Sequence, residues 1–197
     1  MKIELRSFVG SKIGSLLKSS DESYVRASLA KLRRGVGKKP GSMPDIWEFT
    51  LENLPEEFLS KTGEPTNAEW AVHMSMTLFA LHQQGKSLPD NPMSKSGKGE
   101  LQLGGAVRKL IVIGGESAEQ GIKRRFDAAV TADSPEELSH HLRGIIQLLK
   151  SEGVPLDYPQ LAVDLYRFLY PEYRDSVRLR WGQDYYRIGK DEEKDEK

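Results

Sequence analysis

Clusters of arginine and lysine are the residues in this sequence whose type and spacing could do chemistry. Lys123, Arg124 and Arg125 are consecutive, and Arg33 and Arg34 form a second adjacent pair. A guanidinium group on a helix presents a planar set of N–H donors that matches the oxygens of a phosphate. These clusters favour contact with a nucleic-acid backbone, and a solvated basic helix face is the alternative that the same pattern allows.

Catalytic and metal-binding patterns are missing from the sequence. The chain has no cysteine, which excludes a thiolate nucleophile, a disulfide and a thiolate metal site. His73 and His82 lack the i, i+4 partner of a helical metal pair, and the neighbours His140 and His141 point to different sides of a helix. There is no GxxxxGK[ST] phosphate loop and no GxSxG elbow. We therefore expect no enzymatic activity, no metal and no cofactor.

Charge is balanced overall but unevenly distributed along the chain. The 197 residues contain 29 basic and 29 acidic side chains. Residues 24–39 carry six cations and no acid, whereas residues 42–69 carry seven acids against Lys61. A neutral total can therefore hide a basic face and an acidic face. The sequence shows neither a signal peptide nor an apolar run near the ~20 residues of a membrane span, so we expect a cytoplasmic protein without membrane contact.

Helical periodicity of the apolar residues predicts an all-α fold. We expect a single-chain helical bundle over residues 1–188, with two helical halves joined near the loop 86–99 as the alternative. The polar segment 189–197 is expected to be a disordered acidic tail. The predicted helices cover residues 2–18, 21–34, 44–51, 55–59, 66–85, 103–111, 117–130, 134–152 and 158–170, and the last one starts at residue 171.

Start signals define the two central helices. Ser117 with Gln120, and Ser134 with Glu137, have the spacing of a capping box, in which the first and fourth residues exchange hydrogen bonds. Both helices then place apolar residues along one stripe and cations away from it.

Two further features have consequences for the core and the site. Trp47 and Phe49 are expected to anchor a short helix in the core. Residues 86–99 show no periodicity, and a loop of this length is usually either functional or disordered.

Four blocks of the sequence, taken in order, closely resemble the CasB family, which provides the small subunit of the type I-E CRISPR surveillance complex Cascade. The resemblance runs from about residue 24 to residue 187. The blocks are LRRG–G–PG–P–W (32–47), AEW…TLFALHQQG (68–85), RRF…ADSPEELSHHLRGIIQLLKSEGVPLDY (124–158) and VRLRWGQDYYR (177–187).

The resemblance implies an all-helical, non-enzymatic subunit that binds RNA and DNA. In such complexes two copies of the small subunit stack along the guide RNA and contact the backbone subunits and the large subunit. They support the hybrid of guide RNA and target DNA, and the displaced DNA strand, when the R-loop opens. The implied partners are therefore the guide RNA, both DNA strands, other Cascade subunits and a second copy of the chain.

Ten cations are the predicted nucleic-acid-binding residues. Most follow from the resemblance, because they match cations in its blocks or lie where family members also place cations. Lys38 follows from its place in a turn rich in glycine and proline, which would let the backbone approach a ligand. The predicted residues are Arg33, Arg34, Lys38, Lys95, Lys98, Arg108, Arg124, Arg125, Arg143 and Arg180.

Two other functions fit parts of the pattern. A helical protein–protein spacer would use the same cations to pair with acidic neighbouring subunits. A helical transcription regulator would need a recognition helix, and the helix after Ser134 carries only one arginine, Arg143. The nucleic-acid-binding subunit is the function we expect.

Overall fold

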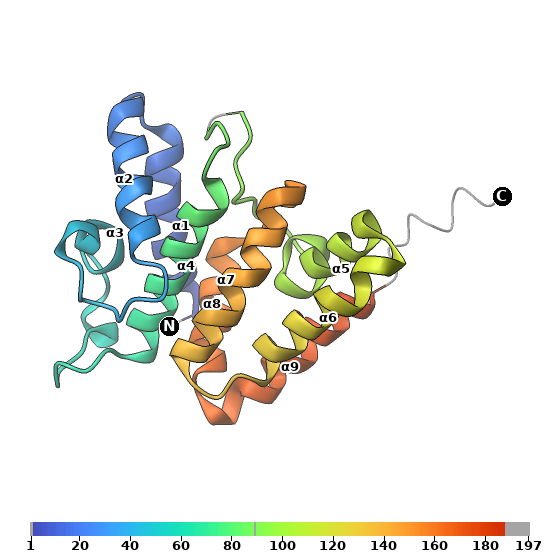
Figure 1. Ribbon diagram of the computed structural model, residues 1–197. Coiled ribbons are helices and arrows are strands. Elements are labelled where there is room, and N and C mark those ends of the chain that lie inside the picture. The colour runs from blue at the N-terminus through green and yellow to red at the C-terminus, as the bar shows by residue number, and fades with distance from the viewer. Residues whose placement is uncertain (1, 89, 188–197) are drawn as a thin grey trace.

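The computed structural model describes residues 2–88 and 90–187, and within these ranges the regular structure is helical apart from one isolated β-bridge. This confirms the predicted all-α bundle (Figure 1). The expected acidic tail lies outside the described residues. The elements are α1 (Lys2–Lys18), α2 (Glu22–Arg34), η1 (Pro44–Ile46), α3 (Trp47–Thr50), η2 (Glu56–Phe58), α4 (Asn67–Gln83), η3 (Gly99–Leu101), α5 (Leu103–Gly114), α6 (Glu116–Thr131), α7 (Pro135–Glu152), α8 (Tyr158–Phe168) and α9 (Pro171–Tyr186).

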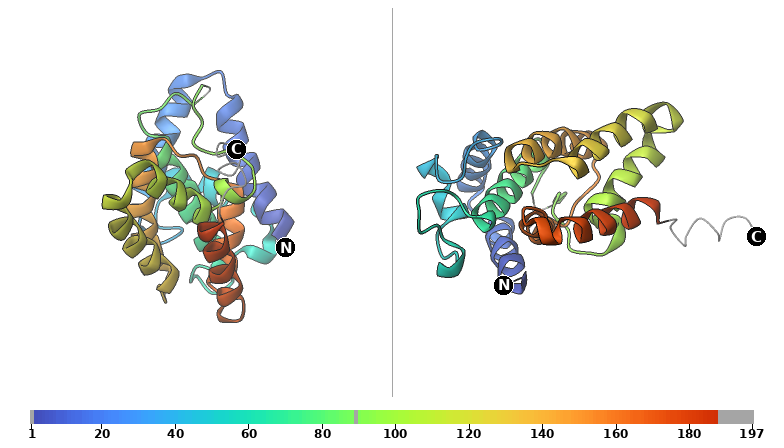
Figure 2. Two further views of the ribbon diagram at one scale, coloured as in Figure 1. Left: turned by 90° about the vertical axis from the view of Figure 1, so that its right-hand side faces the viewer. Right: turned by 90° about the horizontal axis from the view of Figure 1, so that it is seen from below.

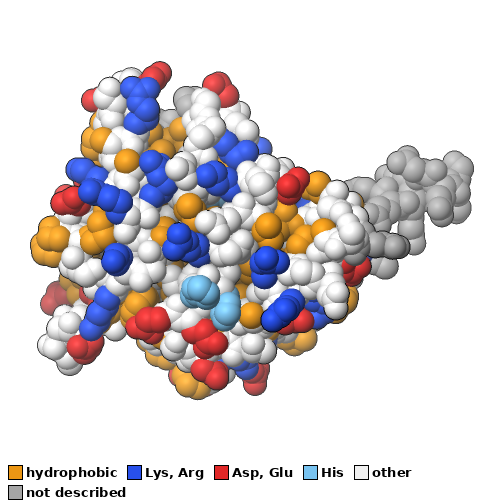
Figure 3. All heavy atoms as spheres, viewed as in Figure 1, with side chains coloured by type: hydrophobic (Ala, Val, Ile, Leu, Met, Phe, Trp, Pro, Cys, Tyr) orange, Lys and Arg blue, Asp and Glu red, His pale blue; other side chains and the backbone are white. Residues whose placement is uncertain are grey.

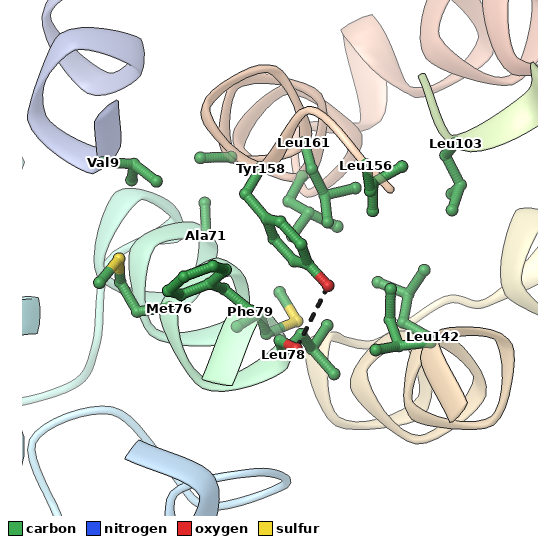
Figure 4. Close-up of a cluster of buried hydrophobic side chains, with 14 of the residues drawn as sticks. Val9, Ala71, Met76, Leu78, Phe79, Leu103, Leu142, Leu156, Tyr158 and Leu161 are labelled. Atoms are coloured by element: carbon green, nitrogen blue, oxygen red, sulfur yellow. Dashed lines mark hydrogen bonds between the residues drawn. The ribbon is translucent and has the colours of Figure 1, made fainter. Parts of the chain in front are cut away.

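Helix α4 lies at the centre of one group of helices. It packs against α1, α2, α7 and α8, and 15 of its 17 residues are buried. A helix that is apolar or small on all sides has no solvent face, which explains its central place. Figure 4 shows side chains from α1, α4, α7 and α8 converging in this core, where the hydroxyl of Tyr158 donates to the carbonyl oxygen of Leu78 at 3.2 Å.

Helices α5, α6 and α9 form a second group beside the first. Helix α5 packs against α6 and α9, and α6 continues the contact to α7. The buried apolar side chains of both groups belong to one hydrophobic cluster. In the view from below, α6 and α7 lie on one side of the molecule, and α9 with the N-terminal part of α1 lies on the other (Figure 2).

Local start and stop signals explain α7 but not α6. The Ser134 hydroxyl accepts the N–H of Glu137 at 3.1 Å, and Gly153 ends α7 with a φ of +67°, as predicted. The capping box predicted at Ser117 is wrong. Helix α6 already begins at Glu116, because α5 continues to Gly114 and Gly115, with a φ of +68°, makes the whole turn between the two helices.

The prediction for the short helix α3 is half correct. Phe49 is 4% exposed and belongs to the core, but Trp47 is 44% exposed, so its expected role as a core anchor is wrong. The buried side of this segment is formed by Ile46, Phe49 and Thr50, and Trp47 points away from it. Its indole N–H donates to the carbonyl oxygen of Gly41 at 3.1 Å, which satisfies its polar atom at the surface.

The long segment after α4 is held by one buried side chain. The amide of Gln83, which is 1% exposed, donates to the carbonyl oxygens of Lys86, Ser87 and Asn91 and accepts the N–H of Met93. A parallel bridge between residues 94 and 156 then ties the segment to the start of α8.

None of the described helices combines the length and apolarity that a membrane span requires.

Candidate nucleic-acid interface

Lys and Arg side chains gather on the side of the protein formed by α2, α7 and α6, with acidic side chains mainly toward its edges (Figure 3). Six of the ten predicted residues belong to these helices and to the loop after α2. We call this set the basic face; it consists of Arg33, Arg34, Lys38, Arg124, Arg125 and Arg143.

The end of α2 is fixed to α4 at Gly35. A Cβ atom at Gly35 would lie 2.8 Å from Thr77 Cγ2 and 3.0 Å from Ile46 Cδ1, so only glycine allows this close packing. The Nε2–H of the buried His73 donates a hydrogen bond to the carbonyl oxygen of Gly35 at 2.9 Å. The buried histidine therefore positions the helix end that carries Arg33 and Arg34.

The cations of this helix end differ in their partners. Arg34 Nη2 lies 2.9 Å from Asp45 Oδ2, in an ion pair whose two side chains are both more than half exposed. Such a pair contributes little and exchanges readily for a phosphate. Arg33 and Lys38 form no ion pair within the described part of the chain.

Helices α6 and α7 present their arginines opposite a shared apolar seam. Phe126 is buried in the core on one helix and Leu142 on the other, which directs the cations outward. Arg124 and Arg143 are exposed, and no described side chain pairs with either of them. Arg125 donates to the carbonyl oxygen of Gly121 in its own helix at 3.0 Å. These arginines keep most of their N–H donors available.

The other four predicted residues lie on different elements. Lys95 is exposed on the long segment, and Arg108 of α5 lies 4.0 Å from Glu119. Lys98 and Arg180 line a cavity of about 670 Å³ between the start of α1, the segment before α5, and α8 and α9. Of the elements that line it, α9 and the N-terminal part of α1 lie on the side of the molecule opposite α6 and α7 (Figure 2). We call it the α1–α9 cavity.

Arg180 also has a structural partner. Its Nη2 lies 2.5 Å from Oδ1 of Asp164, which is 1% exposed and also accepts from Trp181 Nε1 at 2.8 Å. Burial raises the pKa of the Asp164 carboxyl, and the charge of Arg180 opposes that rise. Removing Arg180 would leave a buried carboxylate without its cation, so this residue cannot be treated as a simple surface charge.

Two of the four cationic residues that line the cavity were not among the predictions. Arg6 of α1 and Arg187, directly after α9, line the cavity beside Lys98 and Arg180. Arg187 ends the last block that resembles the CasB family, so that block was an available signal. Arg6 is a single cation on an amphipathic helix, and nothing in its sequence context distinguishes it.

The comparisons with known proteins agree on one family. The model of the family described as CRISPR-associated protein Cse2 matches residues 28–186. The crystal structure of CasB from Thermobifida fusca shares 30% identity and a TM-score of 0.73, over 93% of this chain and 98% of that chain. No curated protein matches the chain significantly.

Two further solved structures share the fold. CasB from M. ruber is 21% identical with a TM-score of 0.68, over 96% of this chain and 98% of that chain. A Cse2-family protein from Thermus thermophilus is 22% identical with a TM-score of 0.63, over 94% of this chain and 97% of that chain. The family model and the structure from Thermobifida fusca confirm the resemblance seen in the sequence, and these two structures agree with it in fold.

Proposed function

The chain belongs to the CRISPR-associated Cse2 family, and from this membership we propose that it is a non-catalytic nucleic-acid-binding subunit of the Cascade complex. In this role it supports the hybrid of guide RNA and target DNA, and the displaced strand, during R-loop formation in antiviral defence. Its partners are the guide RNA, the two DNA strands, the other Cascade subunits and a second copy of itself.

The gathering of cations over α2, α7 and α6 carries this proposal (Figure 3). Exposed arginines on rigid helices bind phosphate oxygens at low entropic cost and release counterions. Base pairing with the guide supplies the sequence specificity, so the subunit needs no base-reading motif. Because R-loop formation exchanges one duplex for another of similar stability, modest backbone contacts shift the equilibrium.

Removing two of these charges should weaken the opening of target DNA. We expect the double variant Arg124→Gln, Arg143→Gln, in a reconstituted complex, to lower the apparent affinity for target duplex about tenfold, with a salt dependence shallower by ~1.5 log units per decade. The measurement is R-loop formation over a range of salt concentrations. Both residues are exposed, so folding should not change.

The control is the pair Lys18→Gln, Lys61→Gln, two exposed cations outside the basic face and the cavity. It removes the same charge and should behave as the parent protein. If the arginine variant assembled normally and opened DNA as well as this control, the basic face would not be the interface. Loss of assembly without a defect in DNA opening by the complexes that do form would favour the protein–protein spacer.

A further inference from the structure

We propose that the α1–α9 cavity binds one backbone phosphate of a single nucleic-acid strand, at a site separate from the basic face. None of the lining residues has a hydrophobic side chain, and four cationic side chains contribute to the lining: Arg6, Lys98, Arg180 and Arg187. They come from α1, from the segment before α5 and from α9, so only the tertiary fold brings them together.

Two of the guanidinium groups are held in place before any ligand binds. Arg6 donates from Nη1 to Gln160 Oε1 at 2.7 Å and from Nη2 to Asp157 Oδ2 at 3.0 Å. Gln160 in turn donates to Asp164 Oδ1 at 2.7 Å, the oxygen that also accepts from Arg180. Asp157 and Asp164 are each 1% exposed. Because these buried groups fix the arginines, a ligand does not have to order them.

Donors remain available after these bonds are counted. The Arg180 side chain remains 29% exposed beside its bond to Asp164, so part of its guanidinium can reach a ligand, whereas its buried Nε cannot. The mouth of the cavity adds the exposed Lys98 and Arg187, whose side chain is 62% exposed. Gly99, with a φ of +61°, lies so close to Arg187 that a Cβ there would be 3.3 Å from Nη1. This close approach places the Arg187 guanidinium beside the segment before α5.

The charge at the cavity matches one phosphodiester. The four cations face one carboxylate in the lining, Asp184, and two behind it, Asp157 and Asp164. Four positive charges against three negative ones leave one net positive charge, and a backbone phosphate carries one negative charge. An acidic peptide segment would instead bring several negative charges close to these three carboxylates, which would repel it.

The lining also restricts which part of a nucleotide can bind. No aromatic side chain is among the lining residues, so a base would find no stacking platform there. The uncharged lining consists of glycine, serine and glutamine, including Gln102 and Gln183, which suits the oxygens of a phosphate and a sugar. Helices α6 and α7 lie on the opposite side of the molecule from α9 and the N-terminal part of α1 (Figure 2). A nucleotide bound in the cavity therefore does not contact the arginines of α6 and α7.

Substitutions at the cavity should change strand binding in both directions. The probe is a fluorescently labelled single-stranded thymidine oligonucleotide, and its affinity for the full chain is measured by anisotropy. We expect Lys98→Gln, Arg187→Gln to weaken binding about fivefold, and the near-isosteric Asp184→Asn to strengthen it about threefold by removing a negative charge. The control Lys18→Gln, Lys61→Gln should bind as the parent does.

Further measurements separate this site from the basic face and from other ligands. In the Arg124→Gln, Arg143→Gln background, both cavity effects should persist, so the two proposals can fail independently. Equal oligonucleotide binding by the parent, Lys98→Gln, Arg187→Gln and Asp184→Asn proteins would overturn the proposal. A second result would also overturn it. In that result the double variant Lys98→Gln, Arg187→Gln loses binding to a polyglutamate peptide or to inorganic phosphate, while its oligonucleotide binding is unchanged.

Discussion

Gly104→Ala is expected to destabilise the protein by about 3 kcal/mol, because a Cβ atom at this position cannot be accommodated between α5 and α9 without moving them apart. It would meet the carbonyl oxygen of Trp181 and lie 2.9 Å from the backbone nitrogen of Tyr185. Both are backbone atoms of α9, so a change of rotamer cannot relieve the contact. The two helices would have to move apart, and Trp181, which is fully buried, would lose its packing.

The same substitution at Gly144 is the matched control. Gly144 lies inside α7, and a Cβ there would meet nothing within 4 Å. Alanine restricts the unfolded chain and favours the helix, so Gly144→Ala should add about 0.5–1 kcal/mol to the free energy of unfolding. Urea denaturation followed by circular dichroism measures both values. Equal effects of the two substitutions would mean that α5 and α9 do not approach as described.

Protonation of His82 is expected to make the protein less stable as the pH falls from 7 to 4. Burial in the core, together with the charge of Lys86, lowers the pKa of His82 to about 4, whereas the unfolded chain has the ordinary value near 6.5. Between these two values the unfolded state binds the proton and the folded state does not. Stability is therefore full above pH 6.5 and declines by about 3 kcal/mol on the way to pH 4.

A difference measurement isolates this histidine from the acidic groups that titrate in the same range. The free energy of unfolding is measured by urea denaturation at several pH values for the parent protein and for His82→Gln. The variant should show a flatter dependence between pH 6.5 and 4, whatever constant loss its altered packing causes. His140→Gln, at an exposed histidine, should keep the parent's dependence. A parent and a His82→Gln protein with parallel profiles would contradict the assignment.

Local signals in the sequence were sufficient to predict where most of the helices lie. Apolar spacing predicted α1, α2, α4, α5, α7, α8 and α9 with small differences at their ends, because a helix depends mainly on residues within one or two turns. The interpretation of His73 and His82 as ordinary polar or packing residues agrees with their burial, where each ring lies within 3.0 Å of a hydrogen-bonding oxygen. The long segment 86–99 was recognised, but its anchor, Gln83, has no sequence signal.

The failures occurred where a neighbour distant in the chain decides the outcome. Trp47 is of a residue type that is often found in the core, but the buried side of α3, which packs against α4, is formed by Phe49 and Thr50. The sequence around Gly104 likewise contains no sign of the close contact that this residue makes with α9. Neither crossing geometry nor the identity of a packed neighbour is encoded in the spacing of a single helix.

For the candidate site, too, some features were determined by the sequence and others only by the tertiary structure. The sequence by itself determined that the chain is helical, that it belongs with the CasB proteins, and which cations are the candidates for phosphate contact. Only the tertiary structure decided that Lys98 and Arg180 join Arg6 and Arg187 around a cavity, while six other cations belong to α2, α6, α7 and the loop after α2. Helix periodicity determines which residues share one side of a helix, whereas the packing of separate helices determines which of those sides form a common surface.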